Sequence, residues 1–207
     1  MDVARPYAAL VPTLDGAVLN ALVGTTRPLS GRELSRLVGK ESHMGVQRVL
    51  NRLVGQGLVN RQEAGRALLY TLNREHLATP AVVILSEIRQ ELLRRLRETI
   101  GSWQVAPVHA SMFGSTARGD GDSSSDIDLF VIRPRSVDPE NHEWRGQLDD
   151  LAASALRWTG NRLSVSEAPE EDIPALRREE RPILRELDAD GILLAGRPLS
   201  DVVVSTP

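Results

Sequence analysis

The sequence predicts an α+β protein built from two modules, and three observations support that prediction. The first part has three segments with the apolar spacing of helices and then a hairpin pattern. The second part mixes strand-like runs with helices. Residues 1–78 hold ten Lys or Arg against six Asp or Glu, whereas residues 79–207 hold fifteen against twenty-two. We therefore expect a basic domain over residues 1–78, a connector helix over 79–102 and an acidic domain over 103–207.

Composition narrows the class of protein further. The chain has 207 residues, of which 41% are hydrophobic and 26% are charged, as in an ordinary folded protein. The sequence contains no Cys, which excludes disulfides and thiolate metal sites and agrees with a cytoplasmic location. The N-terminal stretch does not resemble a signal peptide, and the apolar run at 81–85 is too short to span a bilayer. We expect no membrane association.

Three helices and a β-hairpin are expected within the first 78 residues. Apolar residues recur at helical spacing in three successive segments. In the second of these, Ser30 and Glu33 have the spacing of a capping box, in which each side chain bonds the other residue's backbone amide. After Gly57, two strand-like runs flank a turn at residues 63–66.

This order of elements resembles the winged helix-turn-helix of bacterial transcriptional regulators, whose third helix enters the major groove of double-stranded DNA. The polar face of the third helix carries donors for base edges and phosphates, and the hairpin tip carries a further Arg. The expected DNA-binding residues are Gln47, Arg48, Asn51, Arg52 and Arg66. Two other interpretations stay open: the face is an ordinary solvated surface, or the domain binds a protein.

One long helix is expected over residues 79–102. Thr79 as cap and Pro80 at the first position form a start signal, and apolar residues recur along one side. The simplest interpretation is a helix that packs between the two modules. A helix that joins two chains in a homodimer is the alternative, because winged-helix regulators commonly bind paired half-sites.

The stretch FGSTARGDGDSSSDIDLFVI, residues 113–132, carries the strongest indication of chemistry. We expect a strand that ends near Phe113, a turn with a short helix, and a second strand that contains two aspartates. Asp126 and Asp128 are two residues apart, so on a strand both project from one face, about 7 Å apart. Neighbouring carboxylates repel unless a cation lies between them, and hard oxygen ligands suit Mg²⁺ or Mn²⁺.

The turn before the aspartates complements them. Gly114 lets the backbone approach a ligand closely, and amides at the start of a helix favour an anion such as phosphate. Ser115 adds a hydroxyl donor. Arg118 is placed to pair with a phosphate oxygen or with a neighbouring aspartate.

The order G-S-x-A-R-G-D, a short polar loop and S-D-I-D-L resembles the signature of the DNA polymerase beta nucleotidyltransferase superfamily, closest to its small stand-alone members. The matching residues are Gly114, Ser115, Ala117, Arg118, Gly119, Asp120, Ser125, Asp126, Asp128 and Leu129. The resemblance covers roughly residues 103–200 and implies a small mixed sheet. It also implies that the Gly-Ser turn holds a nucleoside triphosphate and that the aspartates bind divalent metal. An acceptor hydroxyl would then attack the α-phosphate and release pyrophosphate.

One part of that signature is missing. The family carries a third carboxylate on a later strand, which here follows a helix expected at 139–159 with Asp138 as its cap. The position falls near Ser164, whose hydroxyl cannot replace a carboxylate as ligand or base. Glu167 is the nearest acid and the candidate third catalytic residue. Simple alternation places Glu167 on the other face of the strand, unless a bulge or an early strand end redirects it.

The rest of the chain predicts a helix, a short strand at 192–194 and a loosely ordered tail from residue 197. The leading hypothesis is a DNA-binding protein whose metal-dependent domain transfers a nucleoside monophosphate from a nucleoside triphosphate to an unknown acceptor. The alternative is a non-enzymatic transcriptional regulator whose degenerate domain senses a nucleotide or a partner. A third hypothesis is an antitoxin-like role, in which the chain modifies or masks a protein such as a toxin partner.

Overall fold

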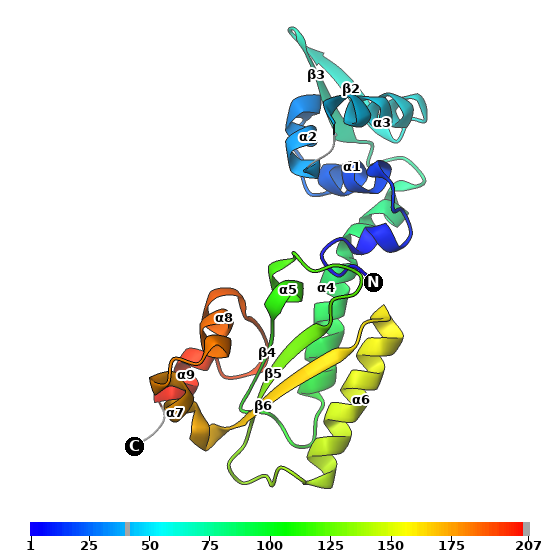
Figure 1. Ribbon diagram of the computed structural model, residues 1–207. Helices are drawn as coiled ribbons and strands as arrows, with labels where there is room; N and C mark the ends of the chain where they lie inside the picture. Colours follow the sequence, from blue (N-terminus) through cyan, green and yellow to red (C-terminus); the bar gives the residue numbers. More distant parts are fainter. Residues whose placement is uncertain (40–41, 205–207) are drawn as a thin grey trace. The chain divides into compact units, whose positions relative to one another are not determined.

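The computed structural model describes residues 1–39 and 42–204, and of residues 203 and 204 only the backbone. It contains two β-sheets together with helices (Figure 1), in agreement with the predicted α+β class. In the part of the chain so described, no helix combines the length and the hydrophobicity needed to cross a bilayer.

By their contacts, the residues divide into two compact units. The N-terminal unit comprises Arg5–Ile88, and the C-terminal unit comprises Met1–Ala4 together with Arg89–Pro207. The division falls within the long helix α4, Thr79–Gly101. The predicted domain limits at residues 78 and 102 stay predictions, and each unit is described below by itself.

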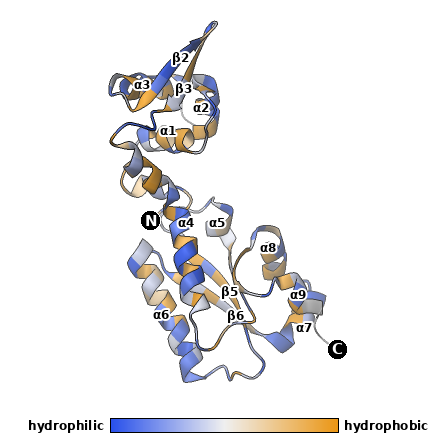
Figure 2. Cartoon of the chain, turned by 180° about the vertical axis from the view of Figure 1, so that it is seen from behind, coloured by the Kyte–Doolittle hydropathy of each residue, from blue (hydrophilic) through white to orange (hydrophobic). Residues whose placement is uncertain are grey.

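The N-terminal unit holds α1, α2 and α3, a three-stranded antiparallel sheet and the first part of α4, in the order that the sequence predicts. Its elements are the 3-10 helix η1 (Pro6–Ala9), α1 (Leu14–Val23), β1 (Leu29–Ser30), α2 (Gly31–Val38), α3 (His43–Gly55), β2 (Val59–Ala64) and β3 (Ala67–Leu72). The sheet order is β1-β3-β2, and the middle of β2 is hydrophilic (Figure 2). Ala64 pairs with Ala67, so the hairpin closes over two residues, and Gly65 takes the positive φ of +61° that such a tight loop requires.

One hydrophobic core joins the three helices to the sheet of this unit. Its fully buried members include Val18 of α1, Leu34 of α2, Leu50 of α3 and Tyr70 of β3. The three helical positions among them belong to the apolar stripes that the helical spacing predicts, since a stripe along one side of a helix must face the core.

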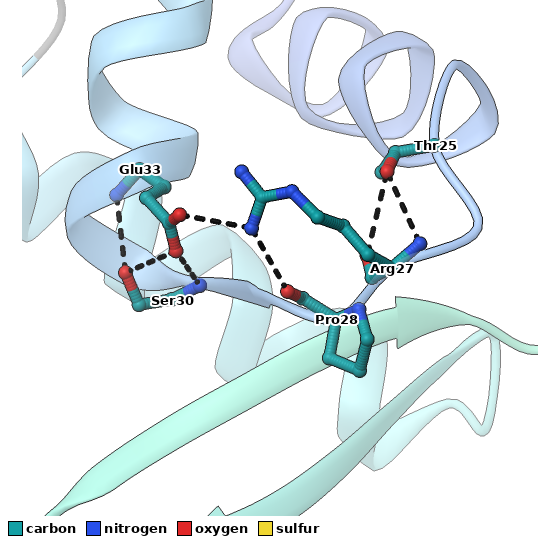
Figure 3. Close-up of polar contacts among 5 residues, drawn as sticks. All are labelled: Thr25, Arg27, Pro28, Ser30 and Glu33. Atoms are coloured by element: carbon teal, nitrogen blue, oxygen red, sulfur yellow. Dashed lines mark hydrogen bonds and ion pairs between the residues drawn. The ribbon is translucent and has the colours of Figure 1, made fainter.

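The predicted capping box is present at the start of α2 (Figure 3). Ser30 Oγ accepts the Glu33 amide at 3.3 Å, and Glu33 Oε2 accepts the Ser30 amide at 2.8 Å. Arg27 Nη1 donates to Glu33 Oε1 at 2.9 Å. The Ser30 amide and hydroxyl, followed by Arg27, lower the pKa of Glu33 to about 2.

The C-terminal unit is built on a four-stranded mixed sheet of order β6-β5-β4-β7. Strands β5 and β6 are parallel, whereas β4 runs antiparallel to both β5 and β7. The elements after α4 are β4 (His109–Phe113), α5 (Gly114–Arg118), β5 (Ile127–Arg133), α6 (His142–Thr159), β6 (Leu163–Pro169), η2 (Glu170–Asp172), α7 (Ile173–Arg178), α8 (Pro182–Asp190), β7 (Ile192–Gly196) and α9 (Leu199–Val204).

Helices cover both faces of this sheet (Figure 1). On one face, α4 and α6 pack against β4 and β5 through residues such as Leu96, Trp144 and Leu151. Both helices mix hydrophobic and hydrophilic residues along their length (Figure 2), as helices with one buried side do. On the other face, α7, α8 and α9 bury Phe130 and Ile132 of β5. The odd and even residues of β5 therefore belong to two different hydrophobic clusters.

Three local predictions differ from the structure. Helix α6 begins at His142 with Asn141 as its cap, because the Asn141 side chain accepts the Trp144 amide at 3.0 Å, and Asp138 lies outside the helix. The predicted short strand extends to Gly196. The loosely ordered tail is wrong for residues 199–204, which form α9 and place Leu199 and Val202 in the cluster that contains Phe130. Residues 205–207 of that predicted tail lie outside the described residues.

Candidate active site

The two aspartates lie at the beginning of β5, directly after the polar loop. Asp126 precedes the strand and is exposed, whereas Asp128 is its second residue and is partly buried. Two buried side chains hold this segment: Thr116 Oγ1 donates to Asp126 O at 3.0 Å, and Asn161 Nδ2 donates to Ser125 O at 2.9 Å. The start of β5 is therefore tied to α5 and to the residues that follow α6.

The Gly114 turn lies directly against Asp128. Gly114 adopts a φ of +70°, and a Cβ at this position would lie 2.5 Å from Asp128 Oδ2. No real Cβ tolerates such a distance, so only glycine lets the turn lie against the carboxylate. The adjacent Ser115 is partly buried, and its carbonyl oxygen accepts three amide hydrogen bonds, from Gly119 (2.9 Å), Asp120 (3.1 Å) and Gly121 (3.2 Å).

Arg89 of α4 holds the other end of α5, a contact that the sequence analysis missed. Its Nη2 donates to Thr116 O at 3.2 Å and to Ala117 O at 2.7 Å, where the last carbonyls of α5 lack helical partners. A cation at the C-terminal end of a helix is favourable. Arg89 therefore positions the short helix whose first residues are Gly114 and Ser115.

Arg118 lies among acids. Its Nε donates to Asp120 Oδ2 at 3.2 Å, and its Nη1 lies 3.9 Å from Asp190 Oδ2 of α8. The hydrogen bond that Arg118 donates to Asp120 is the main reason that the pKa of Arg118 is raised. The predicted pairing with a neighbouring aspartate is thus present at Asp120, and Arg118 is exposed.

The electrostatics of the aspartate pair favour a cation. Burial first, then the charges of Asp126 and Glu186, raise the pKa of Asp128, and Arg118 offsets only part of this effect. A carboxylate in this position is destabilised until positive charge comes near. The donors are carboxylate oxygens, which suit Mg²⁺ or Mn²⁺, so the residues fit such an ion. Across residues 1–39 and 42–204, however, no three His, Asp or Glu side chains are already arranged to hold a metal.

Strand β6 supplies no third carboxylate next to the pair. The parallel register pairs Asp128 with Ser164, which is where the resemblance places that acid, and pairs Val131 with Glu167. Glu167 is three residues beyond Ser164, about 10 Å along the strand and on the opposite face. The register runs evenly from Ile127 to Arg133, so no bulge redirects the side chain.

Glu167 is instead held by two guanidinium groups. Its Oε1 accepts from Arg133 Nε at 2.8 Å, and its Oε2 lies 2.9 Å from Arg145 Nη1 of α6. The side chains of Glu167 and Arg133 are mostly buried, with exposed fractions of 17% and 9%. The structure therefore does not bring Glu167 together with Asp126 and Asp128, and its predicted catalytic role gains no geometric support.

The five predicted DNA-binding residues fall into different environments. Arg48 and Asn51 are exposed on α3. Gln47 Nε2 donates to Tyr70 Oη at 2.7 Å and to Asn51 Oδ1 at 3.2 Å. Arg52 is already engaged, since it pairs with Asp15 of α1 and donates to Gln56 Oε1 at 2.9 Å.

A groove of about 520 Å³ lies between the first turns of α2 and α3 and the hairpin. It brings together two of the predicted residues, Gln47 and Arg66, which are far apart in the sequence. Its full lining is Ser30, Gly31, Arg32, His43, Gln47, Arg66, Ala67, Leu68 and Tyr70. The sequence analysis did not name Arg32 as a candidate, although its place in the first turn of a helix was an available indication.

Comparison with known proteins agrees with the chemistry of the C-terminal unit. Residues 85–158 match the family described as "Nucleotidyltransferase domain", a span that includes both aspartates and ends before β6. This span of the chain is therefore similar to nucleotidyltransferase domains, which generally use a divalent metal ion and a nucleoside triphosphate. A solved chain described as "Crystal structure of the toxin-antitoxin with AMP-PNP" is 17% identical, with a TM-score of 0.38, over 54% of this chain and 81% of that one. No curated protein matches.

Proposed function

We propose that the C-terminal unit transfers a nucleoside monophosphate from a nucleoside triphosphate to an acceptor hydroxyl, with Mg²⁺ or Mn²⁺ held by Asp126 and Asp128. The contact between the Gly114 turn and Asp128 carries this proposal. A Cβ at Gly114 would stand 2.5 Å from Asp128 Oδ2, so the backbone of the turn lies against the partly buried carboxylate. Polyphosphate bound by this turn would therefore lie beside that carboxylate. The match of residues 85–158 to nucleotidyltransferase domains supports the same reaction.

Each of the site residues has a role in this proposal. The backbone at Gly114 and Ser115 holds the triphosphate, and Arg118 is placed to bond one of its oxygens in exchange for Asp120. The divalent ion would supply positive charge against the triphosphate and the departing pyrophosphate. A bond forms between the acceptor oxygen and the α-phosphorus, while the bond from that phosphorus to the pyrophosphate oxygen breaks. The acceptor's proton passes to water.

Transfer of labelled nucleotide tests the proposal. The full chain is incubated with each labelled triphosphate, Mg²⁺ or Mn²⁺ and candidate acceptors, and labelled protein is separated from labelled nucleic acid. The double variant Asp126→Asn/Asp128→Asn is expected to lose transfer by at least 100-fold, while Asp150→Asn on the exposed side of α6 retains it. Equal transfer by the double variant would rule out this site.

A non-enzymatic regulator is the second candidate, and the Ser164 position favours it. With Ser in register with Asp128, the strand offers neither a third ligand nor a base at that point. If the protein is such a regulator, nucleotide binding changes its affinity for DNA and no nucleotidyl-transfer product forms.

The Glu167→Gln variant tests the role of that side chain separately. A catalytic Glu167 predicts lost transfer with unchanged stability, whereas an ion-pair role predicts lower stability with transfer retained.

For the N-terminal unit we propose binding to double-stranded DNA. The groove that contains Arg32, His43 and Arg66 supports this, because guanidinium groups on two sides of a groove suit phosphate oxygens. Arg66→Gln and Arg48→Gln are each expected to weaken DNA binding by about 10-fold and to reduce its salt dependence. The control is Arg157→Gln, at an exposed residue of α6, which is expected to leave both unchanged. Gel-shift titrations at several salt concentrations measure both effects. Unchanged affinity and salt slope in both variants would contradict the proposal.

A further inference from the structure

Helix α8 lies beside the candidate site through contacts that the sequence pattern did not reveal. It contacts α5 and β4, and its inner side buries Leu184 and Leu187 in the cluster that contains Phe130. That packing sets which side of α8 faces α5. Asp190, at the end of the helix, lies 3.9 Å from Arg118 through the closest oxygen and nitrogen atoms.

Glu186 lies one helical turn before Asp190 and therefore on the same side of α8. Its charge acts on Arg118 of α5 and on Asp128 of β5. It reaches the site from a helix on the same face of the sheet as Asp128, which is the face that Ser164 shares. Glu167, in contrast, belongs to the opposite face.

The partners of the α8 acids set Glu186 apart. Asp188 is paired with Arg177, whose Nη2 lies 2.7 Å from Asp188 Oδ1. The exposed Glu186 carboxylate has no ion pair or hydrogen bond with any other described residue. Glu186 therefore adds an unpaired carboxylate to the side of α8 where Asp190 meets Arg118 of α5.

We propose that Glu186 of α8 provides the third carboxylate of the metal site, in place of the strand acid that Ser164 lacks. This inference rests on the proposed metal-dependent function. Mg²⁺ commonly keeps several of its waters and takes only one or two carboxylates directly. Glu186 acts by accepting a hydrogen bond from water on the ion, so it does not need to lie within ligand distance of the aspartates beforehand. Groups that act in this way typically change metal affinity 10- to 100-fold.

Calorimetric titration of the full chain with MnCl₂ tests this assignment directly. Glu186→Gln is expected to weaken Mn²⁺ binding by 10-fold or more without changing the melting temperature, since the side chain is exposed. The matched control is Glu179→Gln, an exposed acid of the neighbouring turn that pairs with Arg181. Adding Ser164→Asp to the Glu186→Gln variant is expected to restore the affinity, because position 164 is in register with Asp128.

The outcomes separate this inference from the function on which it rests. If the unaltered chain binds Mn²⁺ and Glu186→Gln binds it equally well, Glu186 is excluded while the aspartate site stands. An equal loss in Glu179→Gln, or no recovery with Ser164→Asp, also overturns the assignment. If the unaltered chain takes up no Mn²⁺, with or without a non-hydrolysable nucleotide, the metal site and the inference fall together.

Discussion

At position 114 the absence of a side chain decides how closely two parts of the candidate site approach. The residue combines a positive φ of +70° with a carboxylate oxygen 2.5 Å from where its Cβ would be. Gly119, a few residues on, has a similar φ of +78° and nothing within 4 Å of that point. Both positions need a residue that tolerates a positive φ, and only position 114 also has no room for a Cβ.

This pair allows the contact to be separated from the strain. Gly114→Ala and Gly119→Ala are each expected to destabilise the protein by about 1–2 kcal/mol, because both force a side chain into a positive φ. Only Gly114→Ala is expected to weaken Mn²⁺ and nucleotide binding, by 10-fold or more, since its methyl group displaces the Asp128 carboxylate. Urea unfolding and calorimetry measure the two effects. Similar binding by both variants would contradict a role for the close approach.

At the level of single elements, short-range polar contacts decide where helices begin. The capping box of α2 satisfies amides that no helical carbonyl can reach, and Asn141 does the same for α6. Arg89 serves the opposite end of α5 by bonding its last carbonyls. These contacts hold each helix at a defined start or end, and in α5 this places the turn beside Asp128.

The lowered pKa of Glu33 predicts a pH dependence for the stability of the N-terminal unit. Its pKa of about 2 lies below the ordinary value of 4.5, so the ionised form stabilises the folded state. That contribution is complete above pH 4.5 and is lost as the pH falls through about 2. Glu33→Gln should therefore lower the melting temperature at pH 7, with a difference from the unaltered chain that shrinks as the pH falls below 4.5. The exposed hairpin acid Glu63, changed to Gln, is the control.

At the scale of the whole molecule, the C-terminal unit includes the first four residues of the chain. Val3 is 3% exposed and belongs to the cluster formed by α4, α6 and the sheet. All three tryptophans, Trp103, Trp144 and Trp158, belong to or pack against the same cluster. Tryptophan fluorescence therefore reports on this unit alone.

Loss of the Val3 side chain is expected to destabilise the C-terminal unit, although the residue lies at the far end of the sequence. Val3→Ala should reduce the free energy of unfolding by about 2 kcal/mol, because the side chain loses two buried carbon atoms and a small cavity remains. The fluorescence transition in urea should move to lower concentration. Leu10→Ala, at a residue that is 72% exposed, should leave it in place. An unmoved transition in Val3→Ala would show that this segment does not contribute to the core.

Much of the fold was predictable because it depends on neighbours in the chain. The apolar stripe of α3, the Ser30–Glu33 box and the hairpin follow from contacts within a few residues. The helix α9 was missed, since a short apolar segment such as 199–204 becomes helical only when it has a core to cover. The start of α6 was placed three residues too early, with Asp138 as the expected cap, because the sequence pattern did not distinguish it from Asn141, whose side chain accepts the Trp144 amide.

The sequence by itself predicted a site for metal and phosphate, because the Gly-Ser turn and the two aspartates lie within fifteen residues of one another. It also predicted that an acid is missing near Ser164. Only the tertiary structure decided that Glu167 is turned away to two arginines and that α8, which carries Glu186, packs beside α5 on the same face of the sheet as Asp128. Sheet register and helix packing join residues distant in the chain, and local patterns do not encode which distant surfaces will meet.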